Sequence, residues 1–179
     1  TGTPTRASGK DCCREMLSEK LADEAVQFFR KRLTHTKGIY AGQPFIPIPW
    51  QEKVLRDIFG TVKPNGFRQY TTAYVEMGKK NGKSEIGAGI GLYGLFMDNE
   101  PGAEIYSVAR TRNQAGNVFR VAAQMVRNDP LLSAESRIVD STKTIYLRND
   151  PSSYFKILSA DADIEDGCNP HMVIFDELH

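Results

Sequence analysis

Hydrophobic residues near the N-terminus recur at spacings that are typical of helices. Over residues 11–33 an apolar side chain appears every three or four positions, which predicts an amphipathic helix with a basic end. Residues 50–59 show the same spacing, and a Pro-rich extended stretch at 42–49 precedes them. The first ten residues are small and polar and are expected to form a tail. The N-terminal part of the chain is therefore predicted to be mainly helical.

The rest of the chain alternates short apolar runs with longer amphipathic stretches. The predicted strands cover residues 68–77, 103–109, 154–159 and 172–175, with a hairpin over 137–148, and the predicted helices cover 84–98 and 111–128. This alternation predicts an α/β fold with a three-layer, mainly parallel sheet. The helix over 84–98 contains Gly87, Gly89, Gly91 and Gly94, each costing about 1 kcal/mol relative to Ala. Close packing against the sheet is the expected compensation. A Thr cap at residue 111 is expected to begin the other helix.

Composition narrows the functional classes. A chain of 179 residues with 40% apolar and 25% charged residues suits one globular domain. The net charge of +1 gives no global argument for nucleic acid, so any such contact must come from a local patch. The longest apolar stretch, residues 86–97, is too short to span a bilayer, and no secretory signal opens the chain. Three cysteines cannot all pair, so reduced thiols in a cytoplasmic protein are expected.

A phosphate-binding loop (Walker A) is predicted where the first strand meets the first long helix. Gly82, Lys83 and Ser84 match the end of the pattern G-x-x-x-x-G-K-[ST], but its first glycine is displaced by one position, to Gly78. Backbone N–H groups from Lys80 to Ser84 would surround the phosphates, Lys83 would reach the β and γ phosphates, and Ser84 Oγ would bind Mg²⁺. A basic turn before a helix is the alternative interpretation.

A second motif (Walker B) follows 92 residues later. Four apolar residues, 172–175, lead directly into Asp176 and Glu177, which places both acids at the carboxyl end of a predicted strand. Asp176 would hold Mg²⁺, and Glu177 would orient and deprotonate the attacking water. Together the two motifs predict hydrolysis of a nucleoside triphosphate. That prediction requires the ammonium of Lys83 and the two acids to converge on one metal-bound triphosphate.

Other residues near these motifs carry additional hypotheses. Lys79 precedes Lys83 by four residues and would reach the γ-phosphate as an internal finger, although a plain surface lysine fits as well. Trp50 and Gln51 offer a stacking ring and an amide for an adenine, and Trp50 is equally suited to anchoring a core. His179 follows the second motif closely and would couple the site to moving parts.

Three further groups of polar residues are interpreted as structural. The basic run Arg30–Arg32 favours a solvated helix end over a DNA contact. His35 and His171 have no partner that the sequence reveals. The acidic cluster at residues 161–166 lacks regular ligand spacing and is expected to be a solvated loop rather than a metal site.

The chain resembles the large terminase subunits of tailed bacteriophages from about residue 44 to residue 179. The markers are Pro49-Trp50-Gln51, the loop Gly78-Lys79-Lys80-Asn81-Gly82-Lys83-Ser84, Tyr106-Ser107-Val108-Ala109-Arg110 with Gln114-Ala115, Asp166-Gly167, Asn169-Pro170-His171 and Asp176-Glu177-Leu178-His179. The resemblance implies a P-loop NTPase of the additional-strand, RecA-like (ASCE) class that uses ATP and Mg²⁺. It also implies that the whole loop from Gly78 to Ser84, Asn81 included, contacts the nucleotide, and that Lys79 acts as a finger in cis.

The same resemblance implies partners and a division of the chain. Residues 1–43 would be an N-terminal tail and helix, and residues 44–179 a truncated ATPase domain whose C-terminal nuclease domain is absent. The expected substrate is double-stranded DNA, translocated by a homo-oligomeric ring on a portal protein with a small terminase subunit. The expected location is the cytoplasm of the infected bacterial host, with no membrane. DNA cleavage cannot be assigned to this chain.

Two other functions fit the same motifs. A helicase-like DNA translocase of the DExH type would share the Asp-Glu-x-His run at residues 176–179. A nucleotide-binding assembly module with little turnover alone is a non-enzymatic alternative.

Overall fold

The computed structural model describes residues 16–78, 81–109, 112–159 and 169–176. The chain divides into two compact units. The first contains the described residues up to Val26 together with Pro47–Val75, and the second contains Gln27–Ile46 and the described residues from Glu76 onward. Helix α1 (Glu19–Arg32) therefore begins in the first unit and ends in the second.

The first unit combines a short β-ladder with helical segments. Strand β1 (Met16–Leu17) pairs antiparallel with β2 (Thr61–Val62), which directly follows α2 (Pro49–Gly60). The helix predicted over 50–59 is confirmed by α2. Proline at its first position suits a helix start, because the N–H that proline lacks has no partner there. The helix predicted from residue 11 is wrong at its start, because β1 occupies two of its positions and 11–15 lie outside the described residues. Pairing with β2 outweighs the helical periodicity there.

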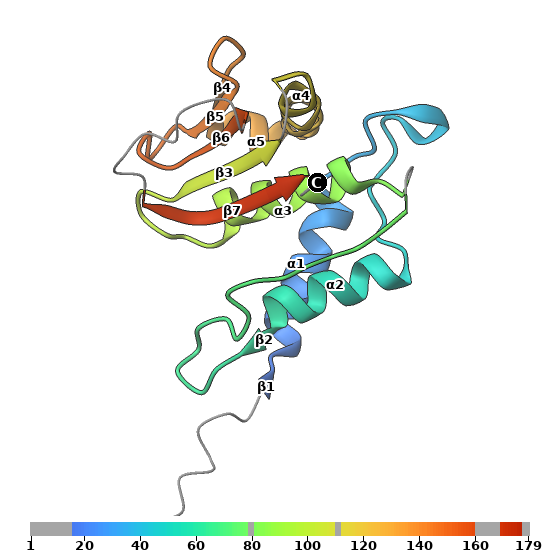
Figure 1. Ribbon diagram of the computed structural model, residues 1–179, viewed down its shortest axis with the longest axis vertical. Helices are drawn as coiled ribbons and strands as arrows, with labels where there is room; N and C mark the ends of the chain where they lie inside the picture. The colour runs from blue at the N-terminus through green and yellow to red at the C-terminus, as the bar shows by residue number, and fades with distance from the viewer. Residues whose placement is uncertain (1–15, 79–80, 110–111, 160–168, 177–179) are drawn as a thin grey trace, which may run out of the picture. The chain divides into compact units, whose positions relative to one another are not determined.

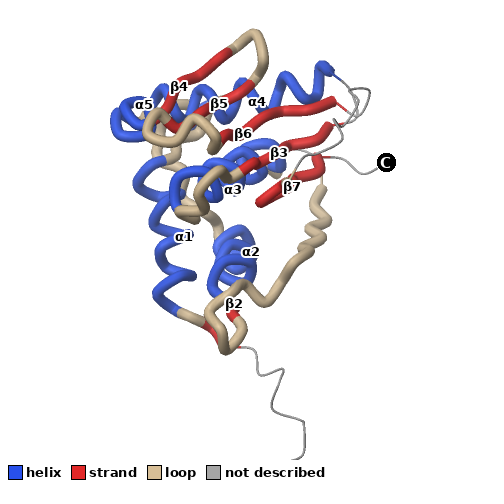
Figure 2. The backbone as a smooth tube through the Cα atoms, turned by 90° about the vertical axis from the view of Figure 1, so that its left-hand side faces the viewer, coloured by secondary structure: helices blue, strands red, loops and turns tan. Residues whose placement is uncertain are grey.

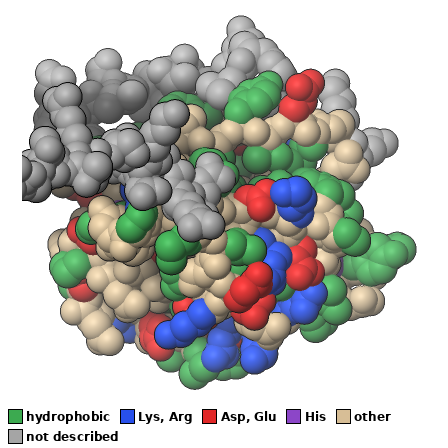
Figure 3. Space-filling model, turned by 90° about the horizontal axis from the view of Figure 1, so that it is seen from below, with side chains coloured by type: hydrophobic (Ala, Val, Ile, Leu, Met, Phe, Trp, Pro, Cys, Tyr) green, Lys and Arg blue, Asp and Glu red, His purple; other side chains and the backbone are tan. Residues whose placement is uncertain are grey.

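Helices α1 and α2 are joined in this unit by a close contact and by ion pairs. A Cβ at Gly60 would lie 2.6 Å from the Cβ of the fully buried Ala22, so the two backbones approach too closely for a larger residue. Arg56 pairs with Asp23 at 2.6 Å and with Glu19. Figure 3 shows a face on which Lys and Arg side chains are interspersed with Asp and Glu side chains. Exposed pairs of this kind contribute little stability, so burial at Gly60 is the stronger contact.

The second unit is built on a five-stranded sheet in the order β4-β5-β6-β3-β7 (Figures 1 and 2). The strands are β3 (Glu104–Ala109), β4 (Ser136–Val139), β5 (Thr144–Leu147), β6 (Tyr154–Ser159) and β7 (Pro170–Asp176). Strand β3 pairs parallel with both β6 and β7, whereas β4, β5 and β6 pair antiparallel. The predicted hairpin and the other strands from 103 onward are confirmed. The sheet is mixed, however, and only its β6-β3-β7 half is parallel as predicted.

Two long helices cover one face of this sheet. Helices α3 (Lys83–Met97) and α4 (Arg112–Asn128) contact each other, and both contact β3 and β6, so they lie on the same side. Both helices were predicted, but Thr111, the expected cap of α4, lies outside the described residues. The C-terminal part of α1 and the short helices α5 (Pro130–Glu135) and η1 (Gly38–Tyr40) are the other described helices of this unit. A second helical layer, as in a three-layer fold, is not among them.

The glycines of α3 allow close packing, as predicted, but against more than the sheet. A Cβ at Gly91 would lie 2.7 Å from Phe155 Cζ, and one at Gly94 would lie 3.1 Å from Ile105 Cδ1. A Cβ at Gly89 would instead collide with Phe29 of α1. At Gly87 the nearest atom would be 3.6 Å away, which is an ordinary contact. Two of the four positions therefore serve the helix–sheet contact, and one serves a helix–helix contact.

Residues 33–45, which we call the strap, follow α1 and form part of the same core. Leu33 and Phe45 at its two ends are almost completely buried. The Phe45 ring meets Phe29 edge-on with 5.6 Å between centroids, and Phe28 meets Tyr93 of α3 at 5.5 Å. These buried aromatic contacts hold the strap against α1 in the core of the second unit.

The strand predicted over residues 68–77 is not formed. Arg68 makes one isolated bridge to Val62, and residues 71–78 belong to no strand and are almost all exposed. A strand needs a neighbour for its backbone groups, and within the described residues β7 pairs only with β3.

No helix in the described part of the chain is long and apolar enough to cross a membrane.

Candidate nucleotide site

The N-terminus of α3 follows a glycine in a left-handed conformation. Gly82 adopts a left-handed conformation with φ 77°, which favours glycine, and Lys83 is the first residue of the helix. The first helical bond runs from Ile86 N to Gly82 O at 3.0 Å. The N–H groups of the first turn come before the hydrogen-bond ladder of the helix begins. Because the helix dipole is positive at this end, these groups suit an anion.

Gly78 and Asn81 lie close together at the start of the loop. A Cβ at Gly78 would lie 3.2 Å from Asn81 Nδ2, so the absence of a side chain makes room for the Asn81 amide. The displaced first glycine of the motif therefore has a local packing role. Lys79 and Lys80, between these two, lie outside the described residues.

Asp176 reaches the same place from the other half of the sequence. It is the last residue of β7 and pairs in register with Ala109 at the end of β3, so it lies at the carboxyl edge of the parallel strands. Helix α3 contacts β7, and Ser84 Oγ lies 3.5 Å from Asp176 Oδ2. The two predicted Mg²⁺ ligands are thus adjacent, although they are 92 residues apart.

The chemistry of this pair suits Mg²⁺. Both atoms are oxygens, the ligand type that Mg²⁺ prefers, and both side chains are half-buried. In an octahedral site with Mg–O distances of about 2.1 Å, adjacent ligand oxygens lie about 3.0 Å apart. The separation of 3.5 Å is close enough that a small side-chain movement would reach this geometry. Ser84 and Asp176 would therefore be able to hold the same ion.

The remaining predicted site residues are not brought together by the described structure. Glu177 and His179 lie outside the described residues, as does the acidic cluster at 161–166. Trp50 and Gln51 belong to α2 in the first unit. Gln51 is buried, and its side-chain oxygen accepts a hydrogen bond from Ile48 N at 3.0 Å, which caps α2. Their roles toward adenine stay predictions.

Sequence reasoning missed Glu85, the residue directly after Ser84. Its carboxylate accepts hydrogen bonds from the backbone N–H of Thr36 at 2.8 Å and from Thr36 Oγ1 at 3.0 Å. His35 Nδ1 lies 2.9 Å from the other carboxylate oxygen. The strap is therefore fastened to the first turn of the phosphate-loop helix. No sequence signal links these residues, because they lie about 50 positions apart.

The two histidines that seemed partnerless both have carboxylate partners. His35 contacts Glu85, and His171 Nε2 lies 2.8 Å from Asp98 Oδ2, which joins the start of β7 to the end of α3. Within the described ranges, no group of three or more His, Cys, Asp or Glu side chains is clustered for a metal. The structural interpretation of both is consistent with these contacts.

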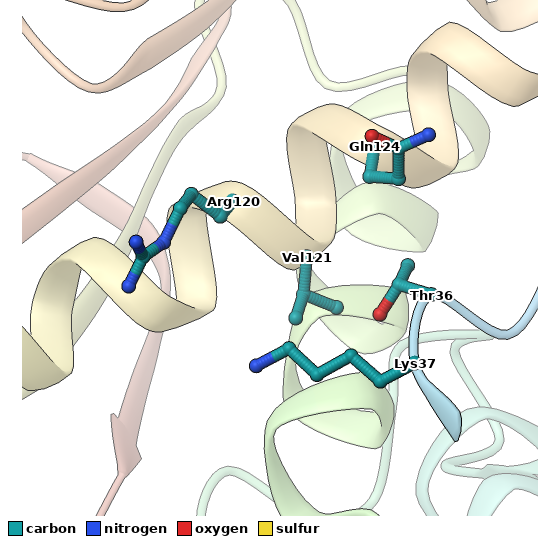
Figure 4. Close-up of a pocket in the computed structure, with 5 residues that line it drawn as sticks. All are labelled: Thr36, Lys37, Arg120, Val121 and Gln124. Atoms are coloured by element: carbon teal, nitrogen blue, oxygen red, sulfur yellow. The ribbon is translucent and has the colours of Figure 1, made fainter. Parts of the chain in front are cut away.

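A separate hollow lies between the strap and α4. It has a volume of about 340 Å³ and is lined by Thr36, Lys37, Arg120, Val121 and Gln124 (Figure 4). None of these residues was singled out from the sequence. The hollow, which we call the strap–α4 pocket, is connected to the first turn of α3 through Thr36 and its hydrogen bonds to Glu85.

Comparison with known proteins agrees with the two motifs. The family described as terminase large subunit, ATPase domain, matches residues 49–179. The large terminase subunit of Enterobacteria phage HK97 is 28% identical over 156 residues, covering 87% of this chain and 30% of that protein. The crystal structure of the HK97 large terminase superposes with a TM-score of 0.73, covering 87% of this chain and 31% of the other. The chain thus spans about 30% of the length of these relatives. It belongs to the family of terminase large subunit ATPase domains.

Proposed function

We propose that this chain is the ATPase portion of a phage DNA-packaging motor, which couples ATP hydrolysis to translocation of double-stranded DNA into a capsid. The observation that carries the proposal is the 3.5 Å approach of Ser84 Oγ and Asp176 Oδ2. This approach supports a single site built from the two motifs, in a chain of the terminase family.

In the proposed mechanism the loop and helix start bind the phosphates. Backbone N–H groups from Lys80 to Ser84 and the ammonium of Lys83 hold the β and γ phosphates, and Ser84 with Asp176 holds Mg²⁺. The bound metal supplies positive charge that neutralises the phosphate oxygens. Glu177 accepts a proton from the attacking water and aligns it with the γ-phosphate. Lys79 adds positive charge as the finger in cis.

The proposed base is adenine, and the proposed fold is that of a RecA-like ATPase. Trp50 stacks on the adenine while Gln51 orients its edge. Residues 44–179 form a RecA-like, additional-strand ATPase domain after an N-terminal extension of residues 1–43. The unpaired edge of β7 within the described residues leaves room for further strands from the rest of the protein. These strands would complete a three-layer domain.

The whole protein is proposed to act in an assembly. A homo-oligomeric ring sits on the portal protein, a small terminase subunit delivers the DNA, and a second domain supplies nuclease activity. The expected place is the cytoplasm of the infected bacterial host, where capsids are filled. These partners follow from membership of the terminase large subunit family, and the HK97 relatives, about three times longer than this chain, leave room for a second domain.

The test combines two variants in the full-length protein. Glu177→Gln keeps the shape of the side chain but removes the base, so hydrolysis should fall on the order of 100-fold or more while ATP binding persists. Lys83→Ala removes charge from the phosphates, so both binding and hydrolysis should be lost. Lys20→Ala is the control, because this exposed cation lies on α1, where it forms a salt bridge with Glu24.

Two measurements decide between outcomes. The release of inorganic phosphate measures ATP hydrolysis. Translocation is measured with a triplex substrate, from which a moving protein displaces the third DNA strand bound to the duplex. Wild-type hydrolysis by Glu177→Gln would reject the catalytic assignment. A wild-type protein that hydrolyses ATP without ever displacing the third strand would reject the motor.

A further inference from the structure

The strap–α4 pocket has walls without acidic residues. Helix α4, over its 17 residues, contains no Asp or Glu, and neither does the strap. The chain as a whole is nearly balanced, with 22 acidic and 23 basic residues. The two segments that form the pocket walls differ from this balance, because the charged residues in them are all basic. Lys37 and Arg120 line the pocket itself. The potential in this hollow is therefore expected to favour an anion.

The two cations of the pocket are available to a ligand. Both side chains are exposed, and neither lies in a salt bridge with any carboxylate of the described residues. The partner of Arg120 is the neutral side chain of Asn117, which accepts a hydrogen bond from it. In Figure 4 the Lys37 ammonium and the Arg120 guanidinium extend toward the same side of the hollow. Arg127, on the same helix, is by contrast paired with Asp140.

The walls of the pocket are held together by contacts outside it. Asn128 Nδ2 donates a hydrogen bond to Thr34 Oγ1 at 2.8 Å, which ties the C-terminal end of α4 to the strap. Arg32 approaches Asp129 at 3.6 Å just beyond. Thr36, which also lines the pocket, is held by its two hydrogen bonds to Glu85. The pocket is thus preformed, and its cations need little ordering beyond their own side chains.

We infer that the strap–α4 pocket binds the phosphodiester backbone of double-stranded DNA through Lys37 and Arg120. The inference deepens the proposed packaging function and rests on it. Phosphate contacts from Lys and Arg carry most of the affinity of sequence-independent DNA binding, which is the kind that a packaging motor needs. On the face that Figure 3 shows, by contrast, charges of both signs are interspersed, and in the first unit Arg56 is paired with Asp23 and Glu19.

The position of Thr36 connects this site with the nucleotide site. Lys37 is its neighbour in the strap, and Thr36 bonds Glu85, which follows the proposed Mg²⁺ ligand Ser84. A phosphate held by Lys37 is therefore one residue from contacts that fix the first turn of α3. This path gives bound DNA a physical connection to the loop that holds ATP.

The experiment compares two double variants of the full-length protein. Lys37→Gln with Arg120→Gln removes both pocket charges, whereas Lys20→Gln with Arg137→Gln removes two exposed charges elsewhere. Binding of a short fluorescent duplex is measured by anisotropy over a series of salt concentrations. The pocket variant should bind roughly tenfold more weakly, and its slope of log affinity against log salt should fall by about 2. The control should keep the wild-type slope, and both variants should keep ATP hydrolysis in the absence of DNA.

The outcomes separate this inference from the proposed function. In one outcome the wild-type protein hydrolyses ATP and binds duplex DNA, but the pocket variant keeps the wild-type slope of log affinity against log salt. The assignment of DNA binding to the pocket is then wrong, and the proposed motor function is unaffected. If the pocket variant loses self-association in sedimentation while its DNA affinity is unchanged, the pocket contacts a second copy instead, and the inference is overturned. A wild-type protein that binds no duplex DNA overturns both.

Discussion

The hydroxyl of Ser84 and the carboxylate of Asp176 give the nucleotide site its most specific test. Replacing Ser84 by Ala removes one oxygen from the proposed metal site and leaves Lys83 and the loop glycines in place. We expect the Mg²⁺ concentration that half-saturates ATP hydrolysis to rise about tenfold or more. Hydrolysis rates measured over a series of Mg²⁺ concentrations check this.

Ser107 provides a matched control for the same substitution. It is fully buried in β3, and its Oγ has no hydrogen-bond partner in the described structure. Ser107→Ala should therefore leave the Mg²⁺ dependence as in the wild type. An equal shift in both variants would mean that Ser84 acts through stability rather than through the metal.

Glu85 allows a second prediction about a single side chain. Glu85→Ala would leave the N–H and hydroxyl of Thr36 and the ring of His35 without their acceptor in a partly buried place. We expect the free energy of unfolding to fall by about 1–3 kcal/mol, as measured by urea denaturation. Glu135→Ala, at an exposed Glu at the end of α5, should change it far less. Equal effects would show that the strap is not held by Glu85.

At the level of elements, the glycines of α3 should respond to substitution in opposite directions. Alanine is favoured over glycine in a helix by about 1 kcal/mol, which acts at both Gly91 and Gly87. At Gly91 the new Cβ would lie 2.7 Å from Phe155 Cζ, so overpacking should destabilise the protein by about 1–3 kcal/mol. At Gly87 the nearest atom would be 3.6 Å away, so Gly87→Ala should stabilise by about 0.5–1 kcal/mol.

Thermal and urea unfolding of the two alanine variants check this pair. If Gly91→Ala stabilises the protein as much as Gly87→Ala does, helix α3 is free to move away from β6. The packing explanation for the glycines of α3 would then be wrong.

The elements that sequence predicted well are those whose signal is local. Helices α2, α3 and α4 follow their apolar spacing, and the β4–β5 hairpin follows its polar turn. The errors concern pairing between distant segments. Met16 and Leu17 fit a helical spacing but pair with β2, and residues 68–77 read as a strand but find no partner in the described chain. Strand formation depends on a neighbour, which a single sequence does not reveal.

The same distinction applies to the candidate site. Ser84 and Asp176 were predictable because each lies in a motif with a known chemical role, and the structure places them together. Glu85 and the strap–α4 pocket were not, because Thr36 and Arg120 have no motif around them and meet only through folding. Lys79, Lys80 and Glu177 stay predictions, since they lie outside the described residues.

At the scale of the whole molecule, the sheet edge formed by β7 is the surface that most needs a covering segment. Among the described residues β7 is the last strand of the sheet, and Val173 and Phe175 on it are 39% and 57% exposed. An unpaired strand edge with exposed apolar side chains is a surface that folded proteins usually cover. The HK97 relatives are about three times longer than this chain, so we propose that residues beyond 179 cover it.

Hydrogen exchange tests this proposal at the one segment predicted as a strand but found unpaired. In the chain of residues 1–179, amides of residues 71–77 should exchange nearly as fast as those of an unfolded peptide, because they pair with no strand in the described structure. In the full-length protein, a completed sheet should pair the same amides and slow their exchange on the order of 100-fold or more. The amides of β3, paired on both sides, serve as the internal control and should be protected in both chains. Equally fast exchange of residues 71–77 in the two chains would mean that this segment is a loop in the complete motor, and the additional-strand, RecA-like sheet would have to be abandoned.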